Sequence, residues 1–487
     1  MLSAETAVTI IFMLAHAAKT AVTMNKYSNS MNKLPLFIGL FGFCLQLSAQ
    51  TNPAITSWLI NTTGIMGQHY LQGNSTPIQD NVLANVQSVQ YSANWVYVGA
   101  TGVPSYITGP FQDGNPSLAS EQSGFHKIPL HPAQNTGTPT VTNPGNIGTF
   151  INGVALFDYR DGVAWNPNTN ALCGGPGNLP CPGGPMAQMD WNRDAIRAER
   201  QGFDCAKAHP AMGNYHHHQN PSAFDLDKVV ISNVCDLYPS DGLYAINETQ
   251  HSPLLGFAYD GFPIYGAYAF KNTDGTGGIV RMKTGYQLRN ITLRTDSPTG
   301  VDVPDGPPVS ATYPLGYFRE DYEYAGGTEP DILDEHNGRF CVTPEYPDGI
   351  YCYFATVDEN WNSAYPYVIG PAFYGVATGS KVQTINESVT TYNPVTATLE
   401  IGSKNLHTTL FPNPASDFIA IQIQGLLQEE MELRLIDTNG KILKQATIKP
   451  GSTISYLDTR TLYGGTYLVS YFINGKLVGS DKVVVLK

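Results

Sequence analysis

The segment from Cys205 to Pro221 is the richest in chemically capable side chains, because four of the chain's eleven histidines fall within ten of its residues. Side chains alternate along a β-strand, so His216 and His218 would project from one face, roughly 7 Å apart along the backbone, with His217 on the other face. Two imidazoles at this spacing can share one metal ion when a third ligand arrives from elsewhere, and His209 is the candidate. Imidazole suits both copper and zinc, so the residues predict a transition-metal site without choosing the metal.

A core-filling role for these histidines is the alternative. Consecutive aromatic and histidine side chains can pack inside a β-sandwich with their ring nitrogens bonded to backbone carbonyls, and an H-x-H pair alone is a weak metal signal. His209 and the glycine-bounded loop before Tyr215 add to the pair. We therefore expect a metal-binding or catalytic role.

Other motifs carry less chemistry. His336 lies in the acidic turn Asp331–His336, which favours an exposed capped loop over a remote metal ligand. Asp260 precedes a glycine, as tight turns favour, so a structural role is expected there. The run Asn272–Gly278 lacks the alternating acids and terminal glutamate of a calcium loop. No serine-hydrolase elbow, H-E-x-x-H motif, P-loop or dinucleotide fingerprint occurs in the sequence, so no nucleotide cofactor is expected.

Composition favours a mostly β protein with few short helices. Only 14% of the 487 residues are charged, while Gly (48), Pro (34) and Tyr (28) are abundant, as in chains of short strands and ordered loops. The 27 Lys and Arg residues against 40 Asp and Glu residues argue against a nucleic-acid or anionic-membrane surface.

An export signal is expected at about 31–49, where Met31-Asn32-Lys33 precedes the apolar run Leu34–Leu47 and a small-residue cleavage site. Residues 1–30 are then a mis-called leader, and Gln50 begins the mature chain. The apolar run is too short for a comfortable membrane span, and no later segment is apolar enough to be one, so the mature chain is expected to lack a transmembrane segment.

Six cysteines remain once the signal with Cys44 is removed, and an even count in an exported chain indicates disulfides. Six cysteines allow 15 pairings, so sequence does not fix them. The three neighbouring pairs are the expectation: Cys173 with Cys181, Cys205 with Cys235, and Cys341 with Cys352. The last pair flanks a Pro-Asp-Gly turn and is expected on opposite strands of a hairpin.

Residues 50–380 form one long β-rich stretch, either one domain or two packed together. Strands are expected at Val86–Val98, Ile147–Phe157, Lys228–Val234 and Gly349–Val357, and a helix at about Trp191–Gln201. A polar stretch at 381–404 is typical of a linker. The tail, 405–487, has alternating strands and two Asn-Gly turns, which predict a small Ig-like antiparallel β-sandwich with strands at Phe418–Ile423, Met431–Ile436, Thr466–Ile473 and Lys482–Leu486.

The tail resembles the type A C-terminal sorting domain of the type IX (Por) secretion system of Bacteroidetes. The matching segments are Phe411–Asp417 (FPNPASD), Leu435–Lys441, Gly465–Val469 and Lys482–Lys487. The resemblance implies export across both membranes to the outer surface or the medium, with the type IX machinery as partner.

The body resembles the YHYH-domain family, named for a Tyr-His-Tyr-His run that here is Tyr215-His216-His217-His218. The likeness spans about residues 52–378 and includes Tyr97–Tyr106, Ile151–Asp158, Leu254–Gly266, Leu333–Phe340 and Thr343–Gly349. This family has no established biochemical role, so the resemblance implies membership and leaves the activity open.

Three hypotheses follow for the body. The first is a secreted or surface protein that binds copper or zinc through His209, His216 and His218. The second is a non-catalytic module that binds glycan or protein through exposed aromatic residues around 91–111 and 361–374. The third is a metal-dependent hydrolase, which needs an open coordination position for an activated water.

The start of the product is directly testable. We expect translation to begin at Met24 or Met31, because the export signal follows Met31 directly. Sequencing the precursor's N-terminus, with the signal peptidase blocked, would contradict this expectation by finding Met1.

Overall fold

The computed structural model describes residues 52–112, 117–184, 188–230, 232–393, 407–424, 429–437, 440–450 and 454–486. The expected leader and signal at 1–49 lie outside these ranges. In the described part of the chain, no helix has both the length and the apolar character needed to cross a membrane. Most of the described chain is strand or ordered loop, which confirms the mostly β expectation.

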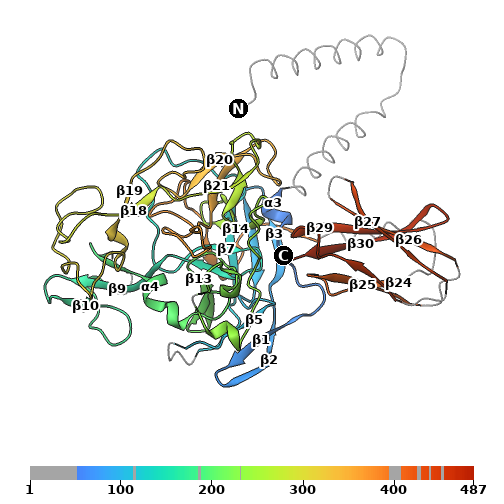
Figure 1. Ribbon diagram of the computed structural model, residues 1–487, viewed down its shortest axis with the longest axis horizontal. Coiled ribbons are helices and arrows are strands. Elements are labelled where there is room, and N and C mark those ends of the chain that lie inside the picture. Colours follow the sequence, from blue (N-terminus) through green and yellow to red (C-terminus); the bar gives the residue numbers. More distant parts are fainter. Residues whose placement is uncertain are drawn as a thin grey trace, which may run out of the picture. The chain divides into compact units, whose positions relative to one another are not determined.

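An eight-stranded mixed sheet forms the centre of the body (Figure 1). Its order is β12 (Ala208–Ala211), β13 (Asn214–His217), β8 (Ala155–Phe157), β7 (Asn146–Phe150), β14 (Leu254–Ala258), β15 (Pro263–Tyr265), β21 (Ile350–Phe354) and β20 (Gly338–Cys341). The pairs β13 with β8 and β15 with β21 are parallel, and the other pairs are antiparallel. All five residues of β14 are buried, as in a strand that is covered on both faces of its sheet.

A five-stranded antiparallel sheet packs against one face of the central sheet. Its order is β22 (Ser380–Val382), β6 (Phe125–Pro129), β4 (Trp95–Ala100), β3 (Val86–Tyr91) and β23 (Thr390–Tyr392). Val89, Val98 and Ile128 from this sheet share one apolar core with Phe257 and Phe354 of the central sheet. A second core, with Tyr353 and Ile369, covers the opposite face.

Smaller elements surround these two sheets. The short strands are β1 (Met66–Leu71), β2 (Asn74–Leu83), β5 (Ile107–Thr108), β9 (Arg160–Asn166), β10 (Ala171–Cys173), β11 (Asn192–Asp194), β16 (Tyr268–Phe270), β17 (Ile279–Arg281), β18 (Tyr286–Leu288) and β19 (Tyr322–Tyr324). The helices are α3 (Pro53–Thr56), α4 (Ala195–Glu199) and the 3₁₀ turns η1 (Arg200–Gly202), η2 (Phe224–Leu226), η3 (Val234–Asp236) and η4 (Arg319–Asp321).

Several expected elements change at their boundaries. Val86–Val98 and Ile147–Phe157 are each two strands with a turn between them, where the side chains of Ser92 and Asn152 accept backbone N–H bonds. The expected helix at Trp191–Gln201 begins only at Ala195, since Asn192–Asp194 pair with β9 as strand β11. The described residues of Lys228–Val234 form no strand, and η3 begins at Val234.

Two strands lie within the stretch expected to be a linker. β22 pairs with β6 and β23 pairs with β3, so the edges of β6 and β3 are covered, and β22 and β23 become the outer strands of the sheet. Open edges expose unpaired backbone groups, and this pairing satisfies them. The polar composition of the stretch reflects edge strands that face solvent.

The tail forms two antiparallel sheets around its own apolar core. One sheet holds β24 (His407–Phe411), β25 (Phe418–Gln424) and β28 (Ile454–Asp458), and the other holds β27 (Ile442–Ile448), β26 (Met431–Ile436), β29 (Gly465–Ile473) and β30 (Lys476–Val485). The turn Asn474-Gly475 joins β29 to β30 with both residues at positive φ, as a tight hairpin requires. The expected antiparallel sandwich is confirmed.

The cysteines form two disulfides, Cys173–Cys181 and Cys205–Cys235. The expected third bond is not formed, and Cys341 and Cys352 are buried free thiols. The two cysteines are diagonal neighbours on the hairpin, since Cys341 lies opposite Ile350 while Cys352 lies opposite Arg339, and their thiols are in contact. The loop between the strands is therefore not centred as the expectation assumed.

The thiol content tests this arrangement. We expect the mature chain, denatured without reductant, to expose two titratable thiols, from Cys341 and Cys352. Cys341→Ser should leave one of them. A mature chain with no titratable thiol would contradict the structure and restore the third disulfide.

Candidate metal centre

The hairpin of β12 and β13 carries the three expected ligands. The antiparallel register sets His209 directly opposite His216. At the hairpin tip, Met212 and Gly213 both adopt positive φ, which allows the tight turn that holds this register. His218 follows β13 and projects to the same side as His216, as strand alternation predicts.

The three imidazoles converge in the folded chain. One nitrogen from each of His209, His216 and His218 lies within 4.8 Å of the others, and all three residues are buried. The Nε2 atoms of His216 and His218 are 3.1 Å apart. The three histidines could therefore hold a metal ion.

Glu199 completes the cluster, and the sequence reasoning missed it. Its Oε2 lies 3.3 Å from Nε2 of His209 and 3.4 Å from Nε2 of His218. Glu199 is the last residue of α4, where an acidic side chain opposes the helix dipole. That unfavourable placement is the one sequence signal that could have drawn attention to it.

Backbone hydrogen bonds fix the tautomers of two histidines. Nδ1 of His216 lies 2.8 Å from the carbonyl oxygen of Asn214, and Nδ1 of His218 lies 2.6 Å from that of Asp158. A carbonyl only accepts, so both Nδ1 atoms carry the proton, and each neutral ring then presents a bare lone pair at Nε2. Two lone pairs would thus face each other across 3.1 Å, beside a carboxylate oxygen. A shared cation or proton relieves that repulsion.

The surrounding charges favour neutral imidazole over imidazolium at His216. Burial lowers the pKa of His216 well below its usual value, and the neighbouring His218 and His209 add to this effect. Burial alone would raise the pKa of Glu199, but the neighbouring imidazoles of His209 and His218, in their protonated forms, outweigh it and lower that pKa. The cluster therefore presents an ionised carboxylate and a neutral His216, which are forms that bind metals.

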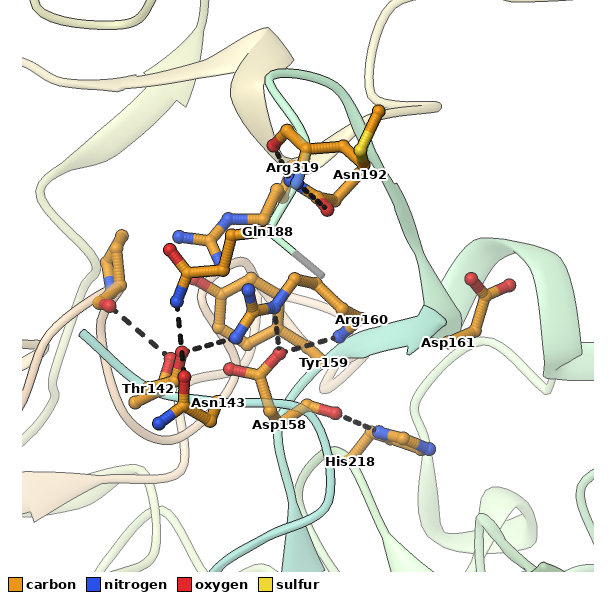
Figure 2. Close-up of polar contacts among 12 residues, drawn as sticks. Thr142, Asn143, Asp158, Tyr159, Arg160, Asp161, Gln188, Asn192, His218 and Arg319 are labelled. Atoms are coloured by element: carbon orange, nitrogen blue, oxygen red, sulfur yellow. Dashed lines mark hydrogen bonds and ion pairs between the residues drawn. The ribbon is translucent and has the colours of Figure 1, made fainter. Parts of the chain in front are cut away.

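A buried ion pair supports the carbonyl that orients His218. Figure 2 shows the Asp158 main-chain oxygen at His218 and the Asp158 carboxylate at Arg160, where Nε lies 2.6 Å from Oδ1. Arg160 also donates to the carbonyl of Thr142.

Aromatic rings pack against the cluster. The Phe157 ring stacks on the His216 ring with centroids 3.8 Å apart, and the Phe203 ring lies edge-on to the His209 ring with centroids 5.0 Å apart. Packing and hydrogen bonds thus hold the rings in place.

His217 faces away from the cluster, as expected. Its Nε2 lies 2.9 Å from the hydroxyl of Tyr106, and its ring packs edge-on against Phe150. Burial lowers the pKa of His217 to about 3, so it is a neutral core residue.

The remaining residues that the sequence singled out have structural roles. Nδ1 of His336 is bonded to the carbonyl of Ala372, and Asp260 accepts from the Tyr353 hydroxyl and the Gly375 amide. Asn272–Gly278 connects the hairpin strands β16 and β17. None of these lies in the histidine cluster.

Comparison with protein-family models identifies two domains in the chain. Residues 125–366 match the model described as YHYH protein, and residues 409–486 match that of the secretion system C-terminal sorting domain. The chain is a YHYH-domain protein with a type IX sorting tail. The tail implies delivery to the cell surface or the medium by the type IX machinery. No curated protein matches the chain.

The strand geometry accounts for the YHYH motif. Its first and third positions, Tyr215 and His217, face the core, where the Tyr215 hydroxyl donates to Asp204. Its second and fourth positions, His216 and His218, face the cluster. The substitution of histidine for the second tyrosine therefore falls on the core face and leaves the YHYH domain's candidate metal centre unchanged.

The helix that carries Glu199 gives a pH-dependent test. Asp194 caps α4 and accepts from the Tyr367 hydroxyl, and burial raises the pKa of Asp194 to about 7 despite that hydrogen bond. Because the pKa of Asp194 is higher in the folded state, its protonation stabilises the fold. This contribution to the free energy of unfolding is complete below the unfolded-state pKa, 3.8, and is lost as the pH rises through about 7. Asp194→Asn removes this titration, so urea unfolding should show the wild type losing stability relative to the variant between these pH values. Parallel pH profiles would contradict the raised pKa.

Proposed function

We propose that this protein binds one transition-metal ion outside the cell through His209, His216, His218 and Glu199. The observation that carries the proposal is the pair of Nε2 lone pairs facing each other at 3.1 Å, fixed there by two Nδ1 hydrogen bonds to carbonyls. Without a cation or a shared proton, this buried arrangement is electrostatically unfavourable. Metal-ligating histidines typically donate their other ring N–H to a carbonyl or carboxylate oxygen in this way.

The separations favour zinc over copper. Four ligands at about 2.0–2.1 Å in a tetrahedron lie roughly 3.3 Å from one another, whereas adjacent ligands in a square plane lie roughly 2.9 Å apart. Two edges, at 3.3 and 3.4 Å, lie at the tetrahedral value, and the third, at 3.1 Å, lies midway between the two values. The remaining separations among the three histidine nitrogens are at most 4.8 Å, so a bound ion would have to draw these nitrogens closer together.

A closed site argues for metal capture or stabilisation. With Glu199 as fourth ligand, a tetrahedral ion keeps no open position for an activated water, which counts against the metal-dependent hydrolase. Glu199 exposes 25% of its side chain while His209 and His218 expose 7% and 3%, so the ion would enter from the Glu199 side.

The surface-binding alternative has less support. It needs exposed aromatic residues around 91–111 and 361–374, but Tyr97, Tyr365, Tyr367 and Phe373 are buried. Trp361 donates its indole N–H to the Tyr268 hydroxyl and stacks beneath Lys228.

Metal analysis of the full chain tests the proposal. We expect one zinc ion per chain after dialysis against zinc, and essentially none in His216→Ala/His218→Ala. Glu199→Gln keeps the side-chain shape but removes the anionic ligand, so it should weaken zinc binding at least about tenfold. His131→Ala is the matched control, since His131 is exposed and bonds only to the Ala93 carbonyl among the described residues.

Two readouts keep the test decisive. Cobalt substitution should give the intense visible absorption of a tetrahedral ion in the wild type and lose it in Glu199→Gln. Thermal unfolding of each metal-free variant separates lost binding from lost folding. Equal, near-zero metal in the wild type and the double variant would refute the proposal.

A further inference from the structure

A small polar cavity of about 50 Å³ lies beside α4 and does not include the metal-site histidines among its lining residues. Lys207, Asp227, Asn362 and Ser363 contribute polar walls, and Phe224 contributes an aromatic one. A space of this size admits a few water molecules or a small polar group.

Three buried polar atoms at this cavity have no hydrogen-bond partner among the described residues: Asp227 Oδ2, Asn362 Oδ1 and Ser363 Oγ. Asp227 as a whole is only 5% exposed. Buried polar atoms are rarely left unpaired, because an unpaired atom has lost its hydrogen bonds to water without replacing them. Their clustering around one cavity indicates a built binding site.

The charges of Lys207 and Asp227 cancel, so among the lining residues of the cavity only Arg200 keeps an unpaired charge. Lys207 Nζ lies 2.6 Å from Asp227 Oδ1 with both side chains at most 1% exposed, and 3.2 Å from the Ser222 hydroxyl. The side-chain amide of Asn362 donates one N–H to the Asp358 carboxylate. The unused groups are therefore two acceptors and one hydroxyl, which fit hydroxyl groups of a ligand better than an ion.

A larger cleft of about 300 Å³ shares Ile196 and Arg200 with the cavity. Arg197, Tyr322 and Tyr367 also line this cleft. The Arg200 guanidinium has no hydrogen bond or ion pair within the described part of the chain, whereas Arg197 already donates to the Leu315 carbonyl. A free guanidinium beside tyrosines suits a carboxylate, which it can bind with two parallel hydrogen bonds.

We propose that the cleft and cavity together bind a small carboxylate that carries hydroxyl groups, of the sugar-acid class. Its carboxylate pairs with Arg200, and its hydroxyls donate to Asp227 Oδ2 and Asn362 Oδ1 in the cavity. Phe224 and Tyr322 offer apolar surface to the C–H face of the ligand. The site uses none of the metal ligands, so binding should not require the metal.

Titration of the full, metal-free chain with D-glucuronate, followed by calorimetry and saturation-transfer NMR, tests the proposal. D-glucose, which lacks the carboxylate, should bind at least about tenfold more weakly. Arg200→Gln should weaken glucuronate binding about tenfold, and Ser363→Ala, which removes one hydroxyl, about threefold.

Arg460→Gln is the matched control, because Arg460 is an arginine with 71% of its side chain exposed in the sorting tail. Its glucuronate affinity should equal that of the wild type. Absence of glucuronate binding, equal binding of glucose, or unchanged affinity in Arg200→Gln would each overturn the proposal. A crystal soaked with glucuronate that shows only water in the cavity would do the same.

Discussion

The parallel pairing of β13 with β8 is the constraint on which the candidate metal centre depends. It sets His216 opposite Ala155 and His217 opposite Leu156, so the next residue along, His218, arrives beside Asp158 just past the end of β8. The Asp158 carbonyl then fixes the His218 ring, and the Arg160 ion pair holds Asp158. A shift of this pairing by one residue would turn every histidine to the opposite face.

The same pairing explains why the site is rigid. β8 pairs with β7, and β7 pairs with β14, the fully buried strand of the central sheet. The hairpin of β12 and β13, which carries His209 and His216, therefore lies at one end of a sheet whose two faces are covered by the two apolar cores. The disulfide Cys205–Cys235 ties down the chain just before β12. Removing such a bond typically costs about 2–5 kcal/mol, so the approach to His209 is braced covalently.

The segment around α4 serves two separate regions. Glu199 turns toward the histidines, while Ile196 and Arg200 line the cavity and cleft beside it. A five-residue helix has little intrinsic stability, so its position depends on tertiary contacts such as the Asp194 cap and its bond from Tyr367. Any ligand in the cleft would therefore act on the helix that carries the fourth candidate ligand.

The sequence by itself determined the class of the protein and three of the four candidate metal ligands, His209, His216 and His218. The FPNPASD opening marked the sorting tail, strand alternation put His216 and His218 on one face, and the cysteine spacing gave two of the disulfides. These are local properties, which a few neighbouring residues decide. Only the tertiary structure decided that Glu199 joins the histidines and that residues 380–392 complete a sheet. Each of these depends on pairing between segments distant in sequence, where register and packing choose among partners that look alike locally.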